Sequence, residues 1–299
     1  MVNTVIIIVG PTASGKTALS LQLAKHLNTH IISADSRQCF RELNIGVAKP
    51  AVEELTLIKH YFVNSHSINE TVTAGVFEQY ALGAAEKIFT HSKYAVMVGG
   101  TGLYIKAFCE GLDEIPEIGD EIRVGIINEY KDKGLQWLQQ QVMKNDPGYW
   151  QDGEQQNPSR LIRALEIKMG TGESILSFQK KQPVTRPFNI IKIGIDLPRT
   201  QLYNNINTRA DEMITKGLVQ EAHSLLPFRN FNALQTVGYR EFFDFFDGKL
   251  TLEKAIVQLK TNTRHYAKRQ ITWFKKDVNI VWNPTFNKLP AFFETLGLG

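Results

Sequence analysis

Residues 5–17 read Val5-Ile6-Ile7-Ile8-Val9-Gly10-Pro11-Thr12-Ala13-Ser14-Gly15-Lys16-Thr17, an apolar run that leads into a glycine-bounded turn. The β-branched run 5–9 predicts a fully buried strand, because a strand covered by helices on both faces is apolar at every position. Leu19, Leu23 and Leu27 follow at helical spacing and predict a helix over 16–27. Strand, turn and helix in this order predict the start of a parallel α/β sheet.

Residues 10–17 fit the phosphate-binding pattern G-x-x-x-x-G-K-[ST], in the strand–turn–helix context that the pattern requires. The glycines let the backbone curl so that successive N–H groups converge on phosphate oxygens, and the helix N-terminus adds partial positive charge. Lys16 supplies a mobile point charge, and the Thr17 hydroxyl is the candidate Mg²⁺ ligand. A chance match in a glycine turn is the alternative. We expect a diphosphate or triphosphate group to bind Gly10, Pro11, Thr12, Ala13, Ser14, Gly15, Lys16 and Thr17.

The rest of the chain continues the alternation of strands and helices. Further strands are predicted at 30–33, 94–98, 190–195 and 278–282, and helices at 75–90 and over most of 200–276. Between about 113 and 188 the β-branched runs vanish and polar helical stretches take over. The predicted fold is α/β: a P-loop NTPase-like parallel sheet flanked by helices, formed by 1–112 and 189–299, with a helical insertion domain at 113–188.

Composition limits the class of protein. The 299 residues are 43% hydrophobic and carry 34 Lys and Arg against 30 Asp and Glu, a net charge of +4 that is compatible with a polyanionic partner. Two cysteines, Cys39 and Cys109, exclude a disulfide scaffold and a four-cysteine zinc site and favour a reducing cytoplasm. The apolar run 5–9 is far shorter than the ~20 residues of a membrane span, so we expect no membrane segment.

An acid is missing where phosphate-transferring enzymes with such a loop usually have one. The strand predicted at 94–98 runs into Gly99-Gly100-Thr101-Gly102, without the acidic residue that helps to hold the metal in NTPases. Asp35 instead follows the strand predicted at 30–33, at the sheet edge where α/β proteins bind ligands. Asp35 could accept a proton from a nucleophile, or it could be a turn residue. This pattern weakens the NTPase interpretation and opens a different use of the diphosphate.

Seven segments that lie in order along nearly the whole chain carry a family resemblance. The phosphate loop is shared by many families, but two segments are specific: Ile31-Ile32-Ser33-Ala34-Asp35-Ser36-Arg37-Gln38 and Thr263-Arg264-His265-Tyr266-Ala267-Lys268-Arg269-Gln270-Ile271-Thr272-Trp273-Phe274. The others are 44–50, 98–104, 160–166 and 237–241. Together they resemble the tRNA dimethylallyltransferases (tRNA isopentenyltransferases) of bacterial type. Cys39-Phe40 and Lys59-His60-Tyr61-Phe62 depart from the family pattern, but remove no acid, base or phosphate ligand.

The resemblance implies a prenyl transfer. Dimethylallyl diphosphate would donate its five-carbon group to the N6 amine of the adenosine immediately 3′ of the anticodon, tRNA position 37, and diphosphate would leave. The phosphate loop would then hold a leaving group, which fits the missing second acid. The implied cofactor is Mg²⁺. The implied partners are dimethylallyl diphosphate and the tRNA anticodon stem-loop, and we expect a cytoplasmic monomer.

The expected site residues come partly from chemistry and partly from the resemblance. An adenine amine is a poor nucleophile, so Asp35 is the expected base that accepts its proton, with Lys16 stabilising the departing diphosphate. The resemblance adds Arg209 as a diphosphate ligand and Thr101 as a catalytic residue near the adenine. Arg209 alone could be a solvated helix residue, and Tyr239 a core residue. The implied tRNA contacts are Asp35, Ser36, Arg37, Gln38, Thr101, Arg123, Ser159, Arg160, Leu161, Ile162, Arg163, Gly238, Tyr239 and Arg240.

A strongly basic stretch near the C-terminus is the expected RNA surface. Residues 254–276 contain no acid and seven cations: Lys254, Lys260, Arg264, Lys268, Arg269, Lys275 and Lys276. Tyr266 and Trp273 interleave with them. We predict a helix that contacts RNA phosphates, chiefly through Arg264, Lys268 and Arg269. The alternative is an exposed helix with a buried aromatic edge.

Three other functions use the same features. A nucleotide or small-molecule kinase would use the phosphate loop with ATP. An isopentenyltransferase acting on free adenine nucleotides would not need the basic helix or the insertion. A non-catalytic RNA-binding module would not need Lys16, Thr17 and Asp35 together, and any multiple turnover would exclude it.

Overall fold

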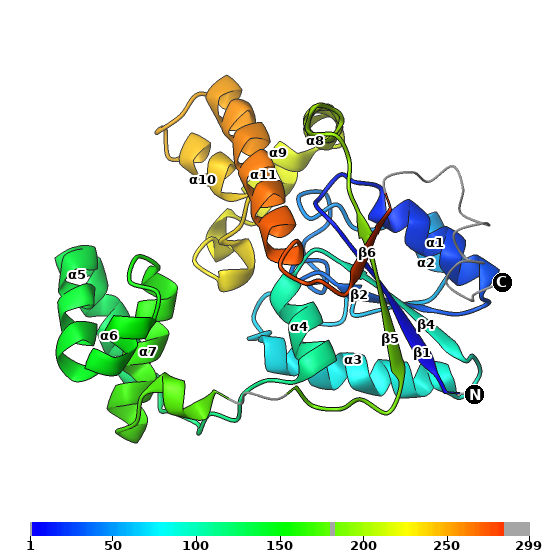
Figure 1. Cartoon of the computed structure of the whole chain (residues 1–299). Coiled ribbons are helices and arrows are strands. Elements are labelled where there is room, and N and C mark those ends of the chain that lie inside the picture. Colours follow the sequence, from blue (N-terminus) through cyan, green and yellow to red (C-terminus); the bar gives the residue numbers. More distant parts are fainter. Residues whose placement is uncertain (1, 180–182, 284–299) are drawn as a thin grey trace. The chain divides into compact units, whose positions relative to one another are not determined.

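The computed structural model describes residues 2–179 and 183–283, which form two compact units. Of the described residues, 2–110 and 185–283 form the core unit, and 111–179 with 183–184 form the insertion unit. The sequence pattern predicts these boundaries at 113 and 188. The secondary structure of both units is drawn in Figure 1.

The core unit contains a six-stranded parallel sheet in the order β3-β2-β4-β1-β5-β6. The strands are β1 (Thr4–Val9), β2 (Ile31–Ala34), β3 (His60–Tyr61), β4 (Tyr94–Gly99), β5 (Asn189–Ile195) and β6 (Ile280–Asn283). The predicted fold class is confirmed. The two-residue β3 was not predicted, because so short a strand has no periodicity to detect.

Helices cover both faces of this sheet (Figure 1). The helices of the described core unit are α1 (Lys16–His26), α2 (Val52–Leu57), α3 (Ala74–Phe89), α4 (Gly102–Glu110), α8 (Arg199–Thr215), α9 (Leu218–Ser224), α10 (Arg240–Phe246) and α11 (Leu252–Phe274). Successive side chains of β1 point to opposite faces, so Ile6 and Ile8 pack with Leu19 and Leu23 of α1, whereas Ile7 joins the cluster under α3 and α4. All six residues of β1 are buried, as the β-branched run predicts.

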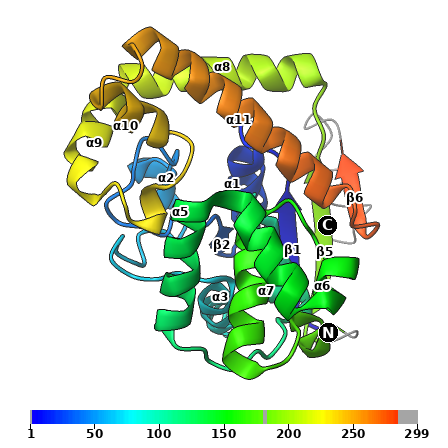
Figure 2. The same cartoon turned by 90° about the vertical axis from the view of Figure 1, so that its left-hand side faces the viewer.

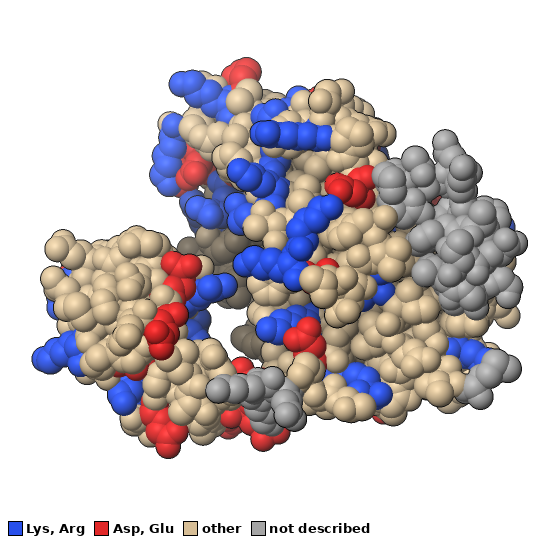
Figure 3. All heavy atoms as spheres, in the orientation of Figure 1, with Lys and Arg blue, Asp and Glu red and all other residues tan. Residues whose placement is uncertain are grey.

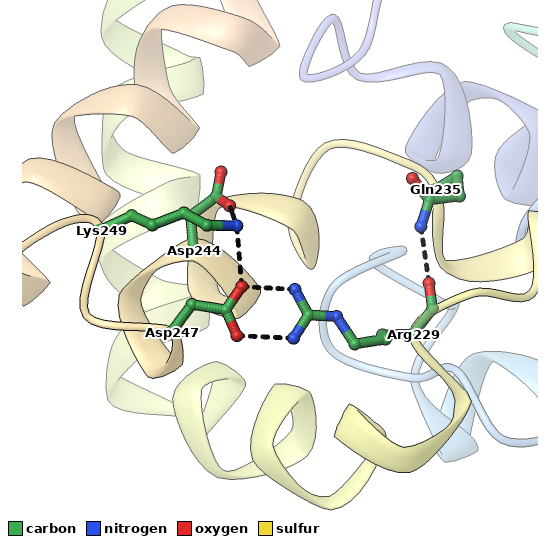
Figure 4. A network of polar contacts seen from close by, with 5 residues as sticks. All are labelled: Arg229, Gln235, Asp244, Asp247 and Lys249. Carbon is green, nitrogen blue, oxygen red and sulfur yellow. Dashed lines mark hydrogen bonds and ion pairs between the residues drawn. The ribbon is translucent and has the colours of Figure 1, made fainter. Parts of the chain in front are cut away.

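The C-terminal helices cover the carboxyl ends of the strands, where the phosphate loop lies (Figure 1). α8 and α11 lie side by side (Figures 1 and 2), joined by a small apolar cluster of Leu202, Ile206 and Ala267. The turns before and after α10 are held by polar contacts, because Arg229 makes a two-pronged ion pair with Asp247 at 2.6 and 2.7 Å (Figure 4). Hydrogen bonds from Arg229 and Lys249 hold the pKa of the Asp247 carboxyl well below its usual range. This network therefore stays charged at neutral pH.

The insertion unit is helical and has its own core. It contains α5 (Asp120–Asn145), α6 (Pro147–Asp152), α7 (Pro158–Thr171) and a 3₁₀ turn (Ile175–Phe178). α5 is interrupted at Gly134, whose φ of 76° is left-handed, and α5 packs along α7 through Leu138, Val142 and Leu165. Among the described residues, no helix of either unit has the length and apolarity that crossing a bilayer requires.

A buried ion pair ties residue 186 to the rest of the core unit. The Arg186 guanidinium contacts the Glu78 carboxylate at 2.5 Å, with side chains only 9% and 12% exposed. It also donates to the carbonyls of Phe108 and Ala107 at 2.8 and 2.9 Å, which lie in the last turn of α4. We expect Arg186→Met to lower the free energy of unfolding by about 3–5 kcal/mol, because Glu78 is left buried without its partner. Urea denaturation measures this loss. A loss below about 1 kcal/mol would contradict the assignment, and adding Glu78→Gln should restore part of it.

Candidate active site

The phosphate loop lies between β1 and α1, as predicted. Gly10 and Gly15 have left-handed φ angles of 151° and 91°, which turn the chain sharply into the helix. The Lys16 ammonium donates a hydrogen bond to the Pro11 carbonyl at 2.5 Å, so the side chain folds back over its own loop. The Ser14 hydroxyl is buried and has no hydrogen-bond partner in the described part of the chain. A buried hydroxyl without a partner is costly, and a bound phosphate oxygen would satisfy it.

Two cations meet at this loop. Burial, and then the neighbouring Arg209 guanidinium, lower the pKa of Lys16 to about 7, while Asp35 acts in the opposite direction. Burial likewise lowers the pKa of Arg209. Arg209 comes from α8 and donates to the Thr12 hydroxyl at 3.2 Å, so it is held against the loop and is not a solvated helix residue. Two partly desolvated cations beside each other are stabilised by a bound anion.

The lowered pKa of Lys16 predicts that the protein takes up a proton when an anion binds. In the free protein at pH 8, Lys16 is mostly neutral because its pKa is about 7. A bound diphosphate raises this pKa, so binding at pH 8 should take up roughly 0.9 proton at Lys16, and much less at pH 6. Calorimetry in buffers of different ionisation enthalpy measures the uptake. Lys16→Arg is the control, since an arginine stays protonated throughout. Equal uptake by the two proteins at pH 8 would contradict this account.

Asp35 lies just beyond β2, where its carboxylate holds a turn and also borders a cavity. Its Oδ1 accepts hydrogen bonds from the backbone N–H groups of Arg37 and Gln38 at 2.8 and 3.3 Å, which makes it a turn residue. The side chain also lines a cavity together with Thr12, Arg37 and Arg209. The second carboxylate oxygen can therefore accept a proton while the first holds the turn.

Thr101 is attached to the Asp35 turn by two hydrogen bonds. Its N–H donates to the Ala34 carbonyl at 3.2 Å, and its hydroxyl accepts from the Ser36 N–H at 3.1 Å. Close approach explains the glycines around it: a Cβ at Gly99 would lie 2.1 Å from the Ala34 carbonyl oxygen, and one at Gly102 would lie 2.2 Å from the Trp273 ring. The loop 99–102 can therefore fit tightly between β2 and α11 only because Gly99 and Gly102 have no side chains.

The cavity has a polar side and an apolar side. It measures about 110 Å³ and is polar at Thr12, Asp35, Arg37, Arg209 and Tyr266. Burial, with a contribution from Asp35, raises the pKa of the Tyr266 hydroxyl to about 12, so it is a neutral donor here. We did not predict Tyr266 as a site residue, although the interleaved aromatics of 263–274 were a signal for it. The apolar wall consists of Val47, Ile206, Met213, Val237 and Leu259.

The residues of the core unit that were predicted to contact RNA differ in their exposure and in their contacts within the protein. Lys268 and Arg269 are exposed on α11, and neither has an acidic partner in the described ranges 2–179 and 183–283. Arg264 packs over the Tyr203 ring, 5.7 Å from its centroid. Arg240 is exposed at the start of α10. The Gln38 amide is used within the protein, since it accepts from the Ser33 hydroxyl and donates to the Ala48 carbonyl.

Tyr239 corrects one prediction. Its side chain is fully buried, and its hydroxyl donates to the Glu221 carboxylate at 2.7 Å. The same carboxylate accepts from the N–H groups of Ile45 and Gly46 at 2.8 and 2.9 Å. Tyr239 is therefore a core residue that holds the cavity wall around Gly46, and its side chain is not available to RNA. The adjacent Gly238 approaches the Gly46 carbonyl so closely that a Cβ would lie 3.0 Å from it.

The insertion unit brings two of its predicted arginines together. Arg123 of α5 and Arg163 of α7 both pair with the buried Glu166, at 2.7 and 3.0 Å, and stay about two-fifths exposed. Ser159 and Arg160 are exposed in the first turn of α7. Leu161 and Ile162, which were predicted to contact tRNA, have side chains buried in the core of the unit. They form the apolar face of α7, so only the polar residues of this turn can contact RNA.

The fold and this site define a phosphate-loop α/β protein whose anion site adjoins a carboxylate. A family model described as "IPP transferase" matches residues 38–277. The tRNA dimethylallyltransferase of Christiangramia forsetii is 48% identical over 282 residues, 94% of this chain and 93% of the relative.

Two crystal structures similar to this chain are also of tRNA isopentenylpyrophosphate transferases. The tRNA isopentenylpyrophosphate transferase of Bacillus halodurans has a TM-score of 0.72 and 35% identity, over 98% of this chain and 95% of that one. The Staphylococcus epidermidis tRNA delta(2)-isopentenylpyrophosphate transferase has a TM-score of 0.71 and 31% identity, over 99% of both chains. The chain belongs to the tRNA dimethylallyltransferase (IPP transferase) family, and the predicted family is confirmed.

Proposed function

We propose that this protein transfers a dimethylallyl group from dimethylallyl diphosphate to tRNA. The acceptor is the N6 amine of the adenosine immediately 3′ of the anticodon, and diphosphate is released. The observation that carries the proposal is the grouping of Lys16 and Arg209 with Asp35. Arg209 lines the cavity that also contains Asp35, and it lines a second cavity together with Lys16 and the phosphate loop, so the three groups surround one site. This arrangement supplies an anion site for the leaving group and a carboxylate for the proton.

The transfer needs one bond to form while another breaks. The adenine amine forms its N–C bond to carbon 1 of the dimethylallyl group, and the bond between that carbon and the diphosphate oxygen breaks. The amine proton goes to the free oxygen of Asp35. The negative charge that develops on diphosphate is stabilised by Lys16, Arg209 and the N–H groups of the phosphate loop.

A magnesium ion fits the site if the diphosphate supplies most of its ligands. No group of three or more His, Cys, Asp or Glu side chains in the described chain could hold a metal ion. The Thr17 hydroxyl is exposed in the first turn of α1, beside the phosphate loop. Mg²⁺ keeps several waters and often binds through substrate phosphates, so one protein hydroxyl is sufficient. When bound, the ion would neutralise charge on the departing diphosphate.

The apolar wall of the cavity suits the five-carbon group. An engineered apolar cavity of about 150 Å³ binds benzene, which has six carbons. The cavity of about 110 Å³ beside Asp35 is smaller and has apolar residues such as Met213 and Leu259 on one side. A short branched hydrocarbon can pack there with its diphosphate toward Arg209.

α11 supplies the charge for an RNA backbone. Lys and Arg side chains gather over this helix on the face seen in Figure 3. Exposed cations such as Lys268 and Arg269, which have no acidic partner among the described residues, release counterions when they contact phosphates. Unpaired bases of a loop can leave their stack at little cost, so an anticodon-loop adenine is accessible to the cavity. We further propose that the protein acts as a cytoplasmic monomer.

The salt dependence of RNA binding tests the role of α11. Replacing Lys268 and Arg269 by glutamine should reduce the slope of log K against log salt by about 1.4, that is ~0.7 for each lost contact with a single strand. Filter binding of an anticodon stem-loop between low and moderate salt measures the slope. The matched control replaces Lys25 and Lys87, exposed cations on α1 and α3, with the same change in net charge. Equal slopes in the two double variants would contradict the assignment.

One assay tests the proposed function. The protein is incubated with Mg²⁺, dimethylallyl diphosphate and an unmodified anticodon stem-loop, and the RNA is examined by mass spectrometry. We expect a gain of one five-carbon unit on the adenosine 3′ of the anticodon over many turnovers. Phosphate transfer from ATP would instead indicate a kinase. Prenylation of free adenine nucleotides, but not of the stem-loop, would indicate an enzyme of the small-molecule type.

A further inference from the structure

A glutamine on the basic helix is buried where a polar side chain needs an explanation. Gln270 of α11 is 6% exposed, although its neighbours Lys268 and Arg269 are exposed. Its Oε1 accepts a hydrogen bond from the Thr12 N–H at 2.8 Å, and its Nε2 donates to the Gly100 carbonyl at 3.0 Å. One amide therefore joins the phosphate loop to the loop that precedes Thr101.

Each of the two loops continues into a different half of the site. On one side, the Thr12 hydroxyl accepts from Arg209, which belongs to the diphosphate half. On the other, Gly100 leads into Thr101, whose hydrogen bonds to Ala34 and Ser36 hold the turn that contains Asp35. Hydrogen bonds and short backbone segments thus connect Arg209 with the turn that contains Asp35, and Gln270 bridges the two loops between them.

The fit at this point is tight. A Cβ at Gly100 would lie 2.0 Å from the Gln270 Nε2, so the amide fills the space beside that backbone. The helix itself does not depend on Gln270, because Leu259, Ala267 and Phe274 anchor α11 in apolar clusters. The amide therefore contributes geometry between the two loops more than attachment of the helix.

We propose that Gln270 is a positioning residue that fixes the distance between the diphosphate loop and the Asp35–Thr101 loop. This inference rests on the proposed function. Bringing two reactants into alignment accounts for a large part of catalysis, and a displacement of about 1 Å can cost ~10²-fold in rate. Loss of the amide should therefore slow the transfer step, while each ligand still binds to its own half of the site.

The test compares Gln270→Met and Gln270→Glu with a matched control, Gln258→Met, whose glutamine is exposed on the same helix. For Gln270→Met we expect a single-turnover rate about 10²-fold below wild type. Its dissociation constants for inorganic diphosphate and for the stem-loop should stay within about threefold, because neither loop loses a ligand. Gln258→Met should behave as wild type.

The pH dependence of the transfer rate in Gln270→Glu separates a positioning role from a purely structural one. Its carboxylate, when ionised, would keep the acceptor for Thr12 but place an oxygen against the Gly100 carbonyl, whereas the protonated carboxyl regains a donor. The rate of this variant relative to wild type should therefore rise as the pH falls. A single-turnover rate of Gln270→Met within threefold of wild type would overturn the inference. So would a Gln270→Met variant that also binds diphosphate and the stem-loop more weakly, combined with a Gln270→Glu rate that does not rise as the pH falls. No transfer by the wild type would remove the proposed function and this inference together.

Discussion

Replacing Asp35 with asparagine slows prenyl transfer by about 10²–10⁴-fold on this account, because the variant loses the base that accepts the amine proton. The amide oxygen can still accept from the N–H groups of Arg37 and Gln38, so the turn should persist. Diphosphate should bind as well as before or slightly better, since a negative charge near Lys16 and Arg209 has been removed.

Single-turnover transfer and calorimetric titration of diphosphate separate these two effects for Asp35→Asn. Glu86→Gln, which removes an exposed carboxylate from α3, is the matched control and should leave both unchanged. If Asp35→Asn transfers at a near-normal rate, another group is the base.

Replacing Lys16 with methionine should lower kcat/KM for the donor by about 10²–10³-fold. This is the usual cost of removing one group that stabilises a developing oxyanion. The free protein should not be destabilised, because burial and Arg209 already disfavour the charged lysine and lower its pKa to about 7. The Lys16→Met variant should therefore lose activity while its melting temperature stays unchanged or rises.

Thermal melts with and without diphosphate check the Lys16→Met prediction. Wild type should be stabilised by the ligand through mass action, and Lys16→Met much less. An equal ligand-induced shift in both proteins would contradict the role of Lys16. A variant that melts far below wild type without ligand would show that the lysine is needed for folding instead.

The features that sequence analysis predicted correctly are local ones. The buried strand β1, the phosphate loop and α1 follow each other within a short stretch, so periodicity and spacing specify them. The boundaries at 113 and 188 were also expected from local composition, and the structure divides the chain at 111 and 184.

The features that were missed depend on contacts between distant segments. The bond from the Thr12 N–H to Gln270 joins residues 258 positions apart, so no local pattern contains it. Tyr239 follows a glycine and precedes an arginine, a setting that suits a surface as well as a core. Only the distant Glu221 and Gly46 show that it is buried. Leu161 and Ile162 belong to a motif whose polar members face solvent, and the motif alone does not separate the two faces.

The proposed transfer requires one bound donor and one bound adenine to lie between the two cations and Asp35. The most direct measurement is a crystal structure with an anticodon stem-loop and a donor analogue whose bridging oxygen is replaced by sulfur. We expect Lys16 and Arg209 to contact the diphosphate oxygens, and Asp35 to lie within about 2.6–3.2 Å of the adenine amine. The proposal would be contradicted if Lys16 and Asp35 contacted different bound molecules and lay too far apart to act on one donor and one acceptor.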